Sequence, residues 1–211
     1  MEIIKKLPFN LVEIAQVFNI KQNQQCTHLD EWLSANYNFN EIEQSILKNT
    51  FERVVIAGNY WNEEELRIRV IGSLFYVADI EQSNDICLFY ERALSATINN
   101  YLLSVVCDCL VASSIFNAPV HPYFFLQELK KAKGEKKDPE AQMLVAMLIA
   151  QHLNNDDKPL YGGYLIGTNC WFSTLIGNKY CLSRQFSLSQ KDDFQHVASI
   201  LRKLKELILN R

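Results

Sequence analysis

Two dipeptides that favour tight turns punctuate the runs of strand-forming residues in this 211-residue chain. Asn99-Asn100 and Gly177-Asn178 each lie between two such runs, and both are typical of the turns of β-hairpins. The runs are rich in apolar and β-branched residues and cover residues 86–98, 101–113, 123–131, 163–176 and 179–186. A chain with this pattern is expected to build a β-sheet that contains antiparallel hairpins.

Segments with helical periodicity surround these runs and cover residues 10–19, 39–57, 62–78, 138–153 and 189–209. Asn62 with Glu65 forms a capping-box pattern, and Asp138-Pro139 combines a helix cap with a first-turn proline. Ser189 and Asp192 form a similar cap pair at the start of the final segment. The order of helix, three antiparallel strands, helix, two strands and helix predicts an α/β (α+β) fold.

The composition indicates one sizeable core, because 48% of the residues are apolar and 21% are charged. No clear linker interrupts the chain. We therefore expect residues 1–58 to form an N-terminal helical extension that packs on a core of residues 59–211.

The net charge of −3 gives no overall basic signature of a nucleic-acid-binding protein, although a local basic strip can supply the attraction. The N-terminus lacks the apolar region of a secretory signal, and the apolar run 143–150 is too short to cross a bilayer. These features predict a cytoplasmic protein that makes no membrane contact.

The six cysteines show no metal-binding spacing, which makes iron–sulfur or zinc ligation the weaker alternative. They are Cys26, Cys87, Cys107, Cys109, Cys170 and Cys181. We expect all six to be small core residues with free thiols in a reducing compartment. Cys107 and Cys109 flank Asp108 and are expected to share the strand face opposite to it.

Asp108, Glu128 and Lys130 are the charged residues that most directly indicate chemistry. Asp108 interrupts an apolar strand, and Glu128 and Lys130 lie two residues apart on the next strand, where side chains share a face. Two carboxylates on neighbouring strands can hold Mg²⁺, or Mn²⁺ in its place, beside a phosphodiester. Lys130 would orient or deprotonate the attacking water, or stabilise the developing charge. The alternative is a solvated surface ion pair between Glu128 and Lys130.

The head of the helix at 62–78 adds further candidates. Its apolar face is expected to hold Leu66, Ile68, Val70, Ile71, Leu74, Phe75, Val77 and Ala78. Arg67 falls near the centre of that face, with Glu63 and Glu64 in the same arc and Glu65 outside it. Glu64 is preferred to Glu63 as a third metal ligand, and Arg67 would contact a phosphate or hold the carboxylate. A buried ion pair that fixes the helix is an equally good interpretation.

Gln142 and the lysines after the third strand complete the set of candidates. Gln142 shares a helix face with Ala146 and Ile149 and would support the metal or a phosphate; its alternative is a glutamine bonded to the backbone. Lys131 and Lys133 belong to a basic strip that could bind backbone phosphates, or could simply be solvated.

These residues together resemble the PD-(D/E)XK, or restriction-endonuclease-like, nuclease superfamily over about 60–211. The resemblance rests on Glu64, Asp108, Glu128-Leu129-Lys130, Gln142 and the order of the elements. It extends to a widespread, uncharacterised bacterial branch through 60–66, 138–142 and 159–162. It implies a central mixed β-sheet flanked by helices and a Mg²⁺-dependent nuclease. Cys107 stands where a proline often precedes the aspartate of the family.

The leading hypothesis is therefore a nuclease that hydrolyses DNA, with RNA possible, by metal-activated water. The alternative is a catalytically silent module of the nuclease fold that binds nucleic acid or a protein partner, and a purely structural protein is a third. Oligomeric state is open, with a homodimer as one option because cutting both strands often requires two copies.

Overall fold

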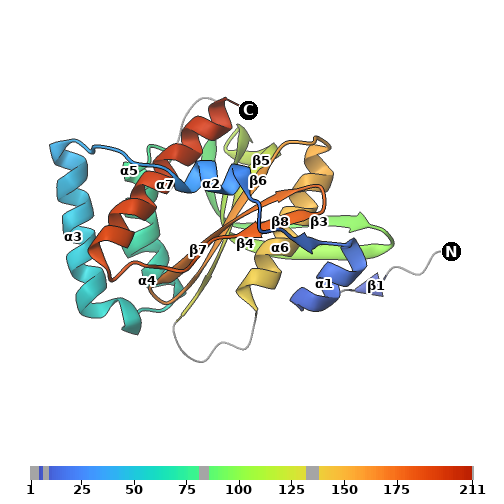
Figure 1. Cartoon of the computed structure of the whole chain (residues 1–211), viewed down its shortest axis with the longest axis horizontal. Coiled ribbons are helices and arrows are strands. Elements are labelled where there is room, and N and C mark those ends of the chain that lie inside the picture. The colour runs from blue at the N-terminus through green and yellow to red at the C-terminus, as the bar shows by residue number, and fades with distance from the viewer. Residues whose placement is uncertain (1–4, 7–9, 81–85, 132–137, 211) are drawn as a thin grey trace.

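The computed structural model of the chain describes residues 5–6, 10–80, 86–131 and 138–210, which form helices around one β-sheet (Figure 1). The α-helices are α1 (Leu11–Phe18), α2 (Thr27–Leu33), α3 (Glu41–Ala57), α4 (Glu63–Leu66), α5 (Gly72–Val77), α6 (Pro139–Asn154) and α7 (Lys191–Leu209). A 3₁₀-helix, η1 (Gly58–Tyr60), and a π-helix, η2 (Arg67–Ile71), lie between α3 and α5. The strands are β1 (Lys5–Lys6), β2 (Lys21–Gln22), β3 (Cys87–Ile98), β4 (Tyr101–Ile115), β5 (Ala118–Lys130), β6 (Leu160–Ile166), β7 (Asn169–Ile176), β8 (Lys179–Leu182) and β9 (Phe186–Ser187).

The sheet is mixed, as the family resemblance implies. Its described strands run in the order β1-β4-β5-β6-β7-β8-β2, with β3 beside β4 and β9 beside β7. Three of the described pairs are parallel: β5–β6, whose strands are joined through α6, and the short pairs β1–β4 and β2–β8. The other described pairs are antiparallel. The prediction of an α/β (α+β) fold with a central sheet flanked by helices is confirmed.

Helices cover both faces of the sheet and create two hydrophobic cores. One core, here called the α7-side core, contains Leu29 of α2, Val54 of α3 and Leu204 of α7. The other, the α6-side core, contains Ile14 of α1 and Met147 of α6. Figure 1 shows α3, α5 and α7 grouped toward the left, α2 near the middle, and α1 and α6 toward the right.

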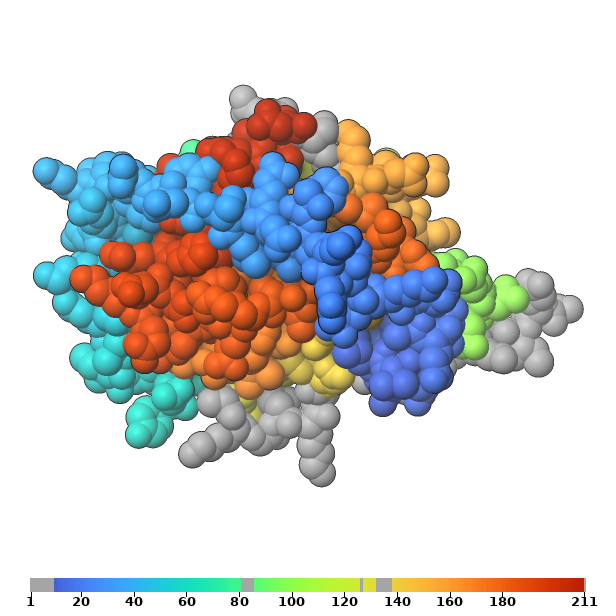
Figure 2. All heavy atoms as spheres, in the orientation of Figure 1, coloured from blue at the N-terminus to red at the C-terminus, as the bar shows by residue number. Residues whose placement is uncertain are grey.

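The N-terminal region packs on the sheet but is not only helical. In Figure 2 the blue N-terminal residues cross the front of the molecule against orange and red atoms of the C-terminal third. Trp32 is fully buried and its indole N–H donates to the carbonyl of Ile200, while β2 adds a parallel strand beside β8. The boundary between residues 58 and 59 stays a prediction.

Several local signals act as expected. Asn99 and Asn100 both adopt positive φ angles (50° and 65°), as the two-residue turn between β3 and β4 requires. Asn62 and Glu65 form a complete capping box, and Asp138 caps α6 by accepting from the N–H of Ala141.

The last third of the chain differs from its predicted strands. The run 163–176 forms two strands because Gly167, with φ 60°, turns the chain and donates its N–H to the carbonyl of Lys130. The run 179–186 contains β8 and then β9, which returns to pair with the start of β7. The final helix begins at Lys191, and Gln190 gives no side-chain cap, so the predicted cap pair Ser189 and Asp192 is wrong.

The segment 62–78 also departs from the predicted regular helix. It contains α4, η2 and α5, and the π-helical turn adds a residue that the 100° period does not accommodate. Ile68 is consequently 65% exposed instead of lying on the apolar face.

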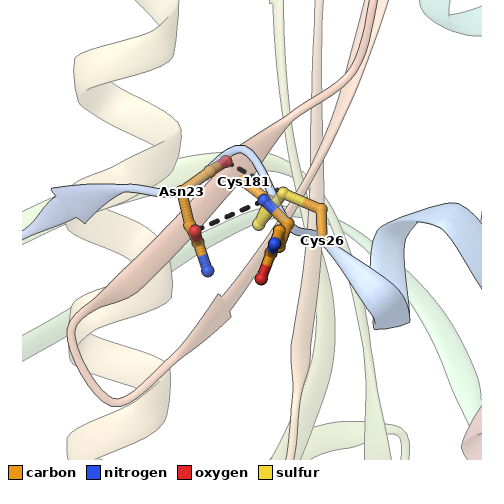
Figure 3. Close-up of a disulfide and its surroundings, with 4 residues drawn as sticks. Asn23, Cys26 and Cys181 are labelled. Carbon is orange, nitrogen blue, oxygen red and sulfur yellow. Dashed lines mark hydrogen bonds between the residues drawn. A yellow bond between two sulfur atoms is a disulfide. The ribbon is translucent and has the colours of Figure 1, made fainter.

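Cys26 and Cys181 form a disulfide, so the expectation of six free thiols is wrong for this pair (Figure 3). The pairing of β2 with β8 brings the two cysteines together across 155 residues of sequence, a separation that cysteine spacing cannot reveal. Asn23 lies beside the bridge, with its carbonyl oxygen 3.0 Å from Cys26 Sγ. Because a disulfide sulfur carries no proton, this contact is an S–H···O hydrogen bond only in the reduced protein.

The four other cysteines are buried and form no disulfide within the described part of the chain. Among the helices that the structure describes, none combines the length and apolarity needed to cross a membrane.

Candidate active site

The candidate residues meet at a fork in the sheet, where β4 and β5 separate. Pairing between these strands ends at Cys109 and Gln127; beyond it β4 continues beside β3, and β5 continues beside β6. Asp108 lies at the fork and its Oδ2 accepts a hydrogen bond of 2.6 Å from the N–H of Leu129. A carboxylate thus takes the place of the next rung of the β-ladder.

Strand β5 brings Glu128 and Lys130 to the same fork. Both residues are buried, with exposed fractions of 2% and 6%. In the register with β6, Glu128 lies beside Tyr164, a member of the α6-side core. The pair is therefore not the solvated surface ion pair that is the alternative interpretation of the sequence.

The ammonium of Lys130 lies among three carboxylates. Its Nζ is 3.6 Å from Glu63 Oε1, 3.9 Å from Glu128 Oε2 and 4.0 Å from Asp108 Oδ2. It donates one hydrogen bond, of 2.7 Å, to the carbonyl of Leu129. The carboxylates therefore converge on a position occupied by positive charge.

The crowded acids perturb one another. Burial, and then the charge of Asp108, raise the pKa of Glu128 to about 9, and Lys130 opposes this effect. Burial also raises the pKa of Asp108, although the hydrogen bond from Leu129 and the charge of Lys130 act in the opposite direction. A divalent cation would relieve this repulsion by favouring the ionised form of both groups.

Three buried side-chain oxygens of β5 and the first turn of α6 have no hydrogen-bond partner among the described residues. They are Oε1 of Gln127, of Glu128 and of Gln142. Gln142 lies in the first turn of α6, the helix that packs on β5, and it is 9% exposed. An unsatisfied buried acceptor is costly and is commonly explained by an ion or water that completes it.

The helix acid nearest to the cluster is Glu63, whereas the sequence favours Glu64. The carboxylate of Glu64 pairs with Arg67 and is 56% exposed. The guanidinium of Arg67 also pairs with Glu91 of β3. The π-helical turn that follows α4 begins at Arg67 and changes the direction in which this helix presents its charges.

Glu91 is the residue that sequence reasoning missed. It has a left-handed backbone, with φ 52°, in the middle of β3, where it stands opposite Asp108 between the pairs Tyr90–Cys109 and Arg92–Cys107. Its charge contributes to the raised pKa of both Asp108 and Glu128. The one available signal was a charged residue inside a predicted apolar strand.

The alternation of side chains reverses at this point in both strands. Cys107 belongs to the α6-side core and Cys109 to the α7-side core, although residues two apart in a regular strand share a face. In β3, Phe89 and Leu94 belong to the same α6-side core although they are five residues apart. The expectation that Cys107 and Cys109 share one face is therefore wrong.

Of the predicted basic strip, Lys131 is exposed, and Lys133 lies outside the described residues.

The chemistry of these residues fits a divalent cation of the Mg²⁺ class. Carboxylate oxygens are its preferred protein ligands, and Glu128 brings an unpartnered one to the site. Within the described ranges no three acidic, histidine or cysteine side chains already form a metal-binding group. The ammonium of Lys130 lies close to all three carboxylates, so binding a cation would require its Nζ to move.

Comparison of the chain with protein-family models and with curated proteins finds no match. The resemblance to the PD-(D/E)XK superfamily therefore rests on the residues and elements described above.

Proposed function

We propose that this protein is a metal-dependent nuclease with a restriction-endonuclease-like core, acting on phosphodiester bonds of DNA or, alternatively, RNA. The observation that carries the proposal is the convergence of Asp108, Glu128 and Lys130 at the fork between β4 and β5. An aspartate at a strand fork beside a Glu-x-Lys strand is what the family resemblance requires. The buried position of Glu128 and Lys130 supports a chemical role.

Asp108, Glu128 and Glu63 would hold the cation. Bound Mg²⁺ or Mn²⁺ supplies a Lewis acid that activates the attacking water and neutralises charge on the phosphate. Glu63 takes this role in preference to Glu64 because its carboxylate lies 3.6 Å from Lys130 Nζ.

Lys130 would donate to the water or to the phosphate oxygen that gains charge during attack. Gln142 would offer its unpaired Oε1 as an acceptor within the site. Arg67 would bind a neighbouring phosphate through its planar, always charged guanidinium.

The test is cleavage of labelled single- and double-stranded DNA and RNA oligonucleotides by protein first treated with EDTA, with Mg²⁺, Mn²⁺ or Ca²⁺ then restored. Asp108→Asn and Lys130→Met are expected to lose at least about 100-fold of the cleavage rate while circular dichroism shows an unchanged fold. Glu65→Gln is the matched control, because Glu65 belongs to the same helix turn as Glu63 but pairs with Arg69. Full cleavage by Glu65→Gln, together with its loss in the other two variants, excludes a contaminating nuclease as the source of the activity.

Equal cleavage by Asp108→Asn, Lys130→Met and the wild type would refute the proposal. Oligonucleotide binding without cleavage, and without calorimetric Mn²⁺ binding, would favour the catalytically silent module. Light scattering in the same experiment decides whether a homodimer forms on the substrate.

A further inference from the structure

The ion pair between Arg67 and Glu91 joins two unusual backbone conformations. Arg67 begins the π-helix η2, in which the N–H of Gly72 bonds to the carbonyl of Arg67 five residues earlier. Glu91 has a left-handed backbone within a strand. Both conformations are rare and occur preferentially at functional sites.

Strand pairing gives no reason for the left-handed conformation of Glu91. The residues on either side keep a constant register with β4, so no extra residue has to be absorbed. A glycine would adopt this φ without steric cost, whereas a glutamate adopts it with strain. The presence of a long charged side chain at this position is explained if its carboxylate is used.

The carboxylate of Glu91 contacts the guanidinium of Arg67. A second nitrogen of the guanidinium contacts Glu64, and the group lies 6.0 Å from the ring centroid of Tyr90. The Arg67 side chain is only 16% exposed, so these three neighbours fix it in one direction. Because Glu91 stands opposite Asp108 across the β3–β4 ladder, the guanidinium is held at the edge of the carboxylate cluster.

We propose that Glu91 is a positioning residue of this site, which holds Arg67 where its guanidinium binds a phosphate of the nucleic-acid substrate next to the phosphate that is cleaved. The inference rests on the proposed function and deepens it. Glu91 itself does not touch the substrate; it acts through Arg67.

The sign of one substitution separates this role from simple electrostatics. Glu91→Gln removes a negative charge, so charge alone predicts equal or tighter binding of an oligonucleotide. Loss of a positioning residue predicts binding that is weaker by about tenfold, because Arg67 loses its preferred geometry. The measurement is fluorescence anisotropy of a labelled oligonucleotide in Ca²⁺ at several salt concentrations.

A double-variant cycle gives the second readout. Arg67→Ala should weaken binding and reduce the slope of log affinity against log salt by about one. In the Arg67→Ala background, adding Glu91→Gln should restore part of the affinity, because only repulsion by Glu91 is left to remove. Glu65→Gln, in the same helix turn as Glu64, should change neither the affinity nor the slope.

Glu91→Gly guards against a variant that merely misfolds. It should show the same loss of affinity as Glu91→Gln but a higher midpoint of thermal unfolding, because glycine relieves the left-handed strain. Binding as tight as wild type in both Glu91 variants, beside intact wild-type cleavage, would overturn the inference and leave the nuclease proposal standing. Failure of the wild-type protein to bind any oligonucleotide would overturn both.

Discussion

Glu128 is the side chain of this site whose burial is most unfavourable for the stability of the fold. It is 2% exposed, one of its carboxylate oxygens has no partner, and its pKa is raised to about 9. At neutral pH the folded protein therefore keeps a proton on Glu128 that the unfolded chain has released. A residue that stabilises the fold poorly but lies among other acids is better explained by ligand binding than by structure.

The free energy of unfolding should consequently depend on pH in a defined direction. The pKa of Glu128 rises on folding from 4.5 to about 9, so its contribution to stability is complete below about pH 4.5 and is lost as the pH rises toward 9. In EDTA, Glu128→Gln should exceed the wild type in unfolding free energy by more than about 1 kcal/mol at pH 8, and the difference should shrink toward pH 5. Urea denaturation at both pH values measures this. A difference that does not vary with pH would contradict the assignment.

Gln142 allows a separate test at the residue scale. Gln142→Met removes a buried amide oxygen that has no hydrogen-bond partner among the described residues, so thermal stability should be equal or higher, while cleavage should fall by about 10–100-fold. Gln151→Met is the matched control: Gln151 lies on the same helix and also has an unpaired buried oxygen, but it bonds to Gly177 at the far end. A Gln142 variant with full activity would remove the residue from the site.

Asp108, Glu128 and Lys130 could be selected from the sequence because each is a charge inside a run of apolar residues. Glu91 is also a charge inside a predicted apolar strand, but that pattern does not encode its left-handed backbone or its pairing with Arg67. The sequence could not show that Glu63, and not Glu64, lies beside Lys130, because the expected face rests on a helix period of 100° that η2 interrupts.

At the scale of elements, the sequence predicted caps and turns reliably where the residues that form them are close together in the chain. The Asn62–Glu65 capping box and the Asn99-Asn100 turn involve residues within a few positions of each other. The division of 163–176 into β6 and β7 depends instead on a hydrogen bond from Gly167 to Lys130, a distant partner. The start of α7 is likewise determined by the pairing of β9 with β7.

Contact between the N-terminal helices and the sheet can be tested at Gly58. A Cβ atom there would lie 2.6 Å from Cγ2 of Thr168, a stiff β-branched side chain in the β6–β7 turn. Gly58→Ala should therefore lower the unfolding free energy by about 1–3 kcal/mol.

Gly72→Ala is the companion control. A Cβ atom at this position would have the carbonyl oxygen of Arg67 as its nearest neighbour, at 3.6 Å, which is an ordinary contact. Alanine should therefore stabilise the helix by about 0.5–1 kcal/mol. Thermal and urea unfolding of the two variants should thus shift in opposite directions. A neutral Gly58→Ala would mean that α3 and the β6–β7 turn separate easily.

At the scale of the whole molecule, the disulfide ties the N-terminal segment to the far edge of the sheet. Cys26 precedes α2 and Cys181 lies in β8, so the bridge closes a loop that includes most of the fold. Neither the loop nor the bridge could be predicted from sequence, because the pairing of β2 with β8 is set by tertiary packing.

Reduction of this bridge should lower the unfolding free energy by about 2–4 kcal/mol. Urea denaturation with and without dithiothreitol measures the change. The double variant Cys26→Ala/Cys181→Ala should have the unfolding free energy of the reduced protein, and dithiothreitol should not change it, since the four remaining cysteines are buried and form no disulfide. Equal stability of oxidised and reduced wild-type protein would show that the bridge adds nothing.

The fork between β4 and β5 also has a mechanical consequence. Asp108 and Glu91 lie on the β3–β4 hairpin, which beyond Cys109 no longer pairs with β5 and is here called the arm. Glu128 and Lys130 lie on β5, which pairs with β6 in the body of the sheet. Any tilt of the arm changes the gap between the two pairs but not the spacing within each. A cation bound to both Asp108 and Glu128 would connect the arm to the body of the sheet. Binding of the cation should therefore also make the arm more rigid, which slower hydrogen exchange along residues 93–106 would show.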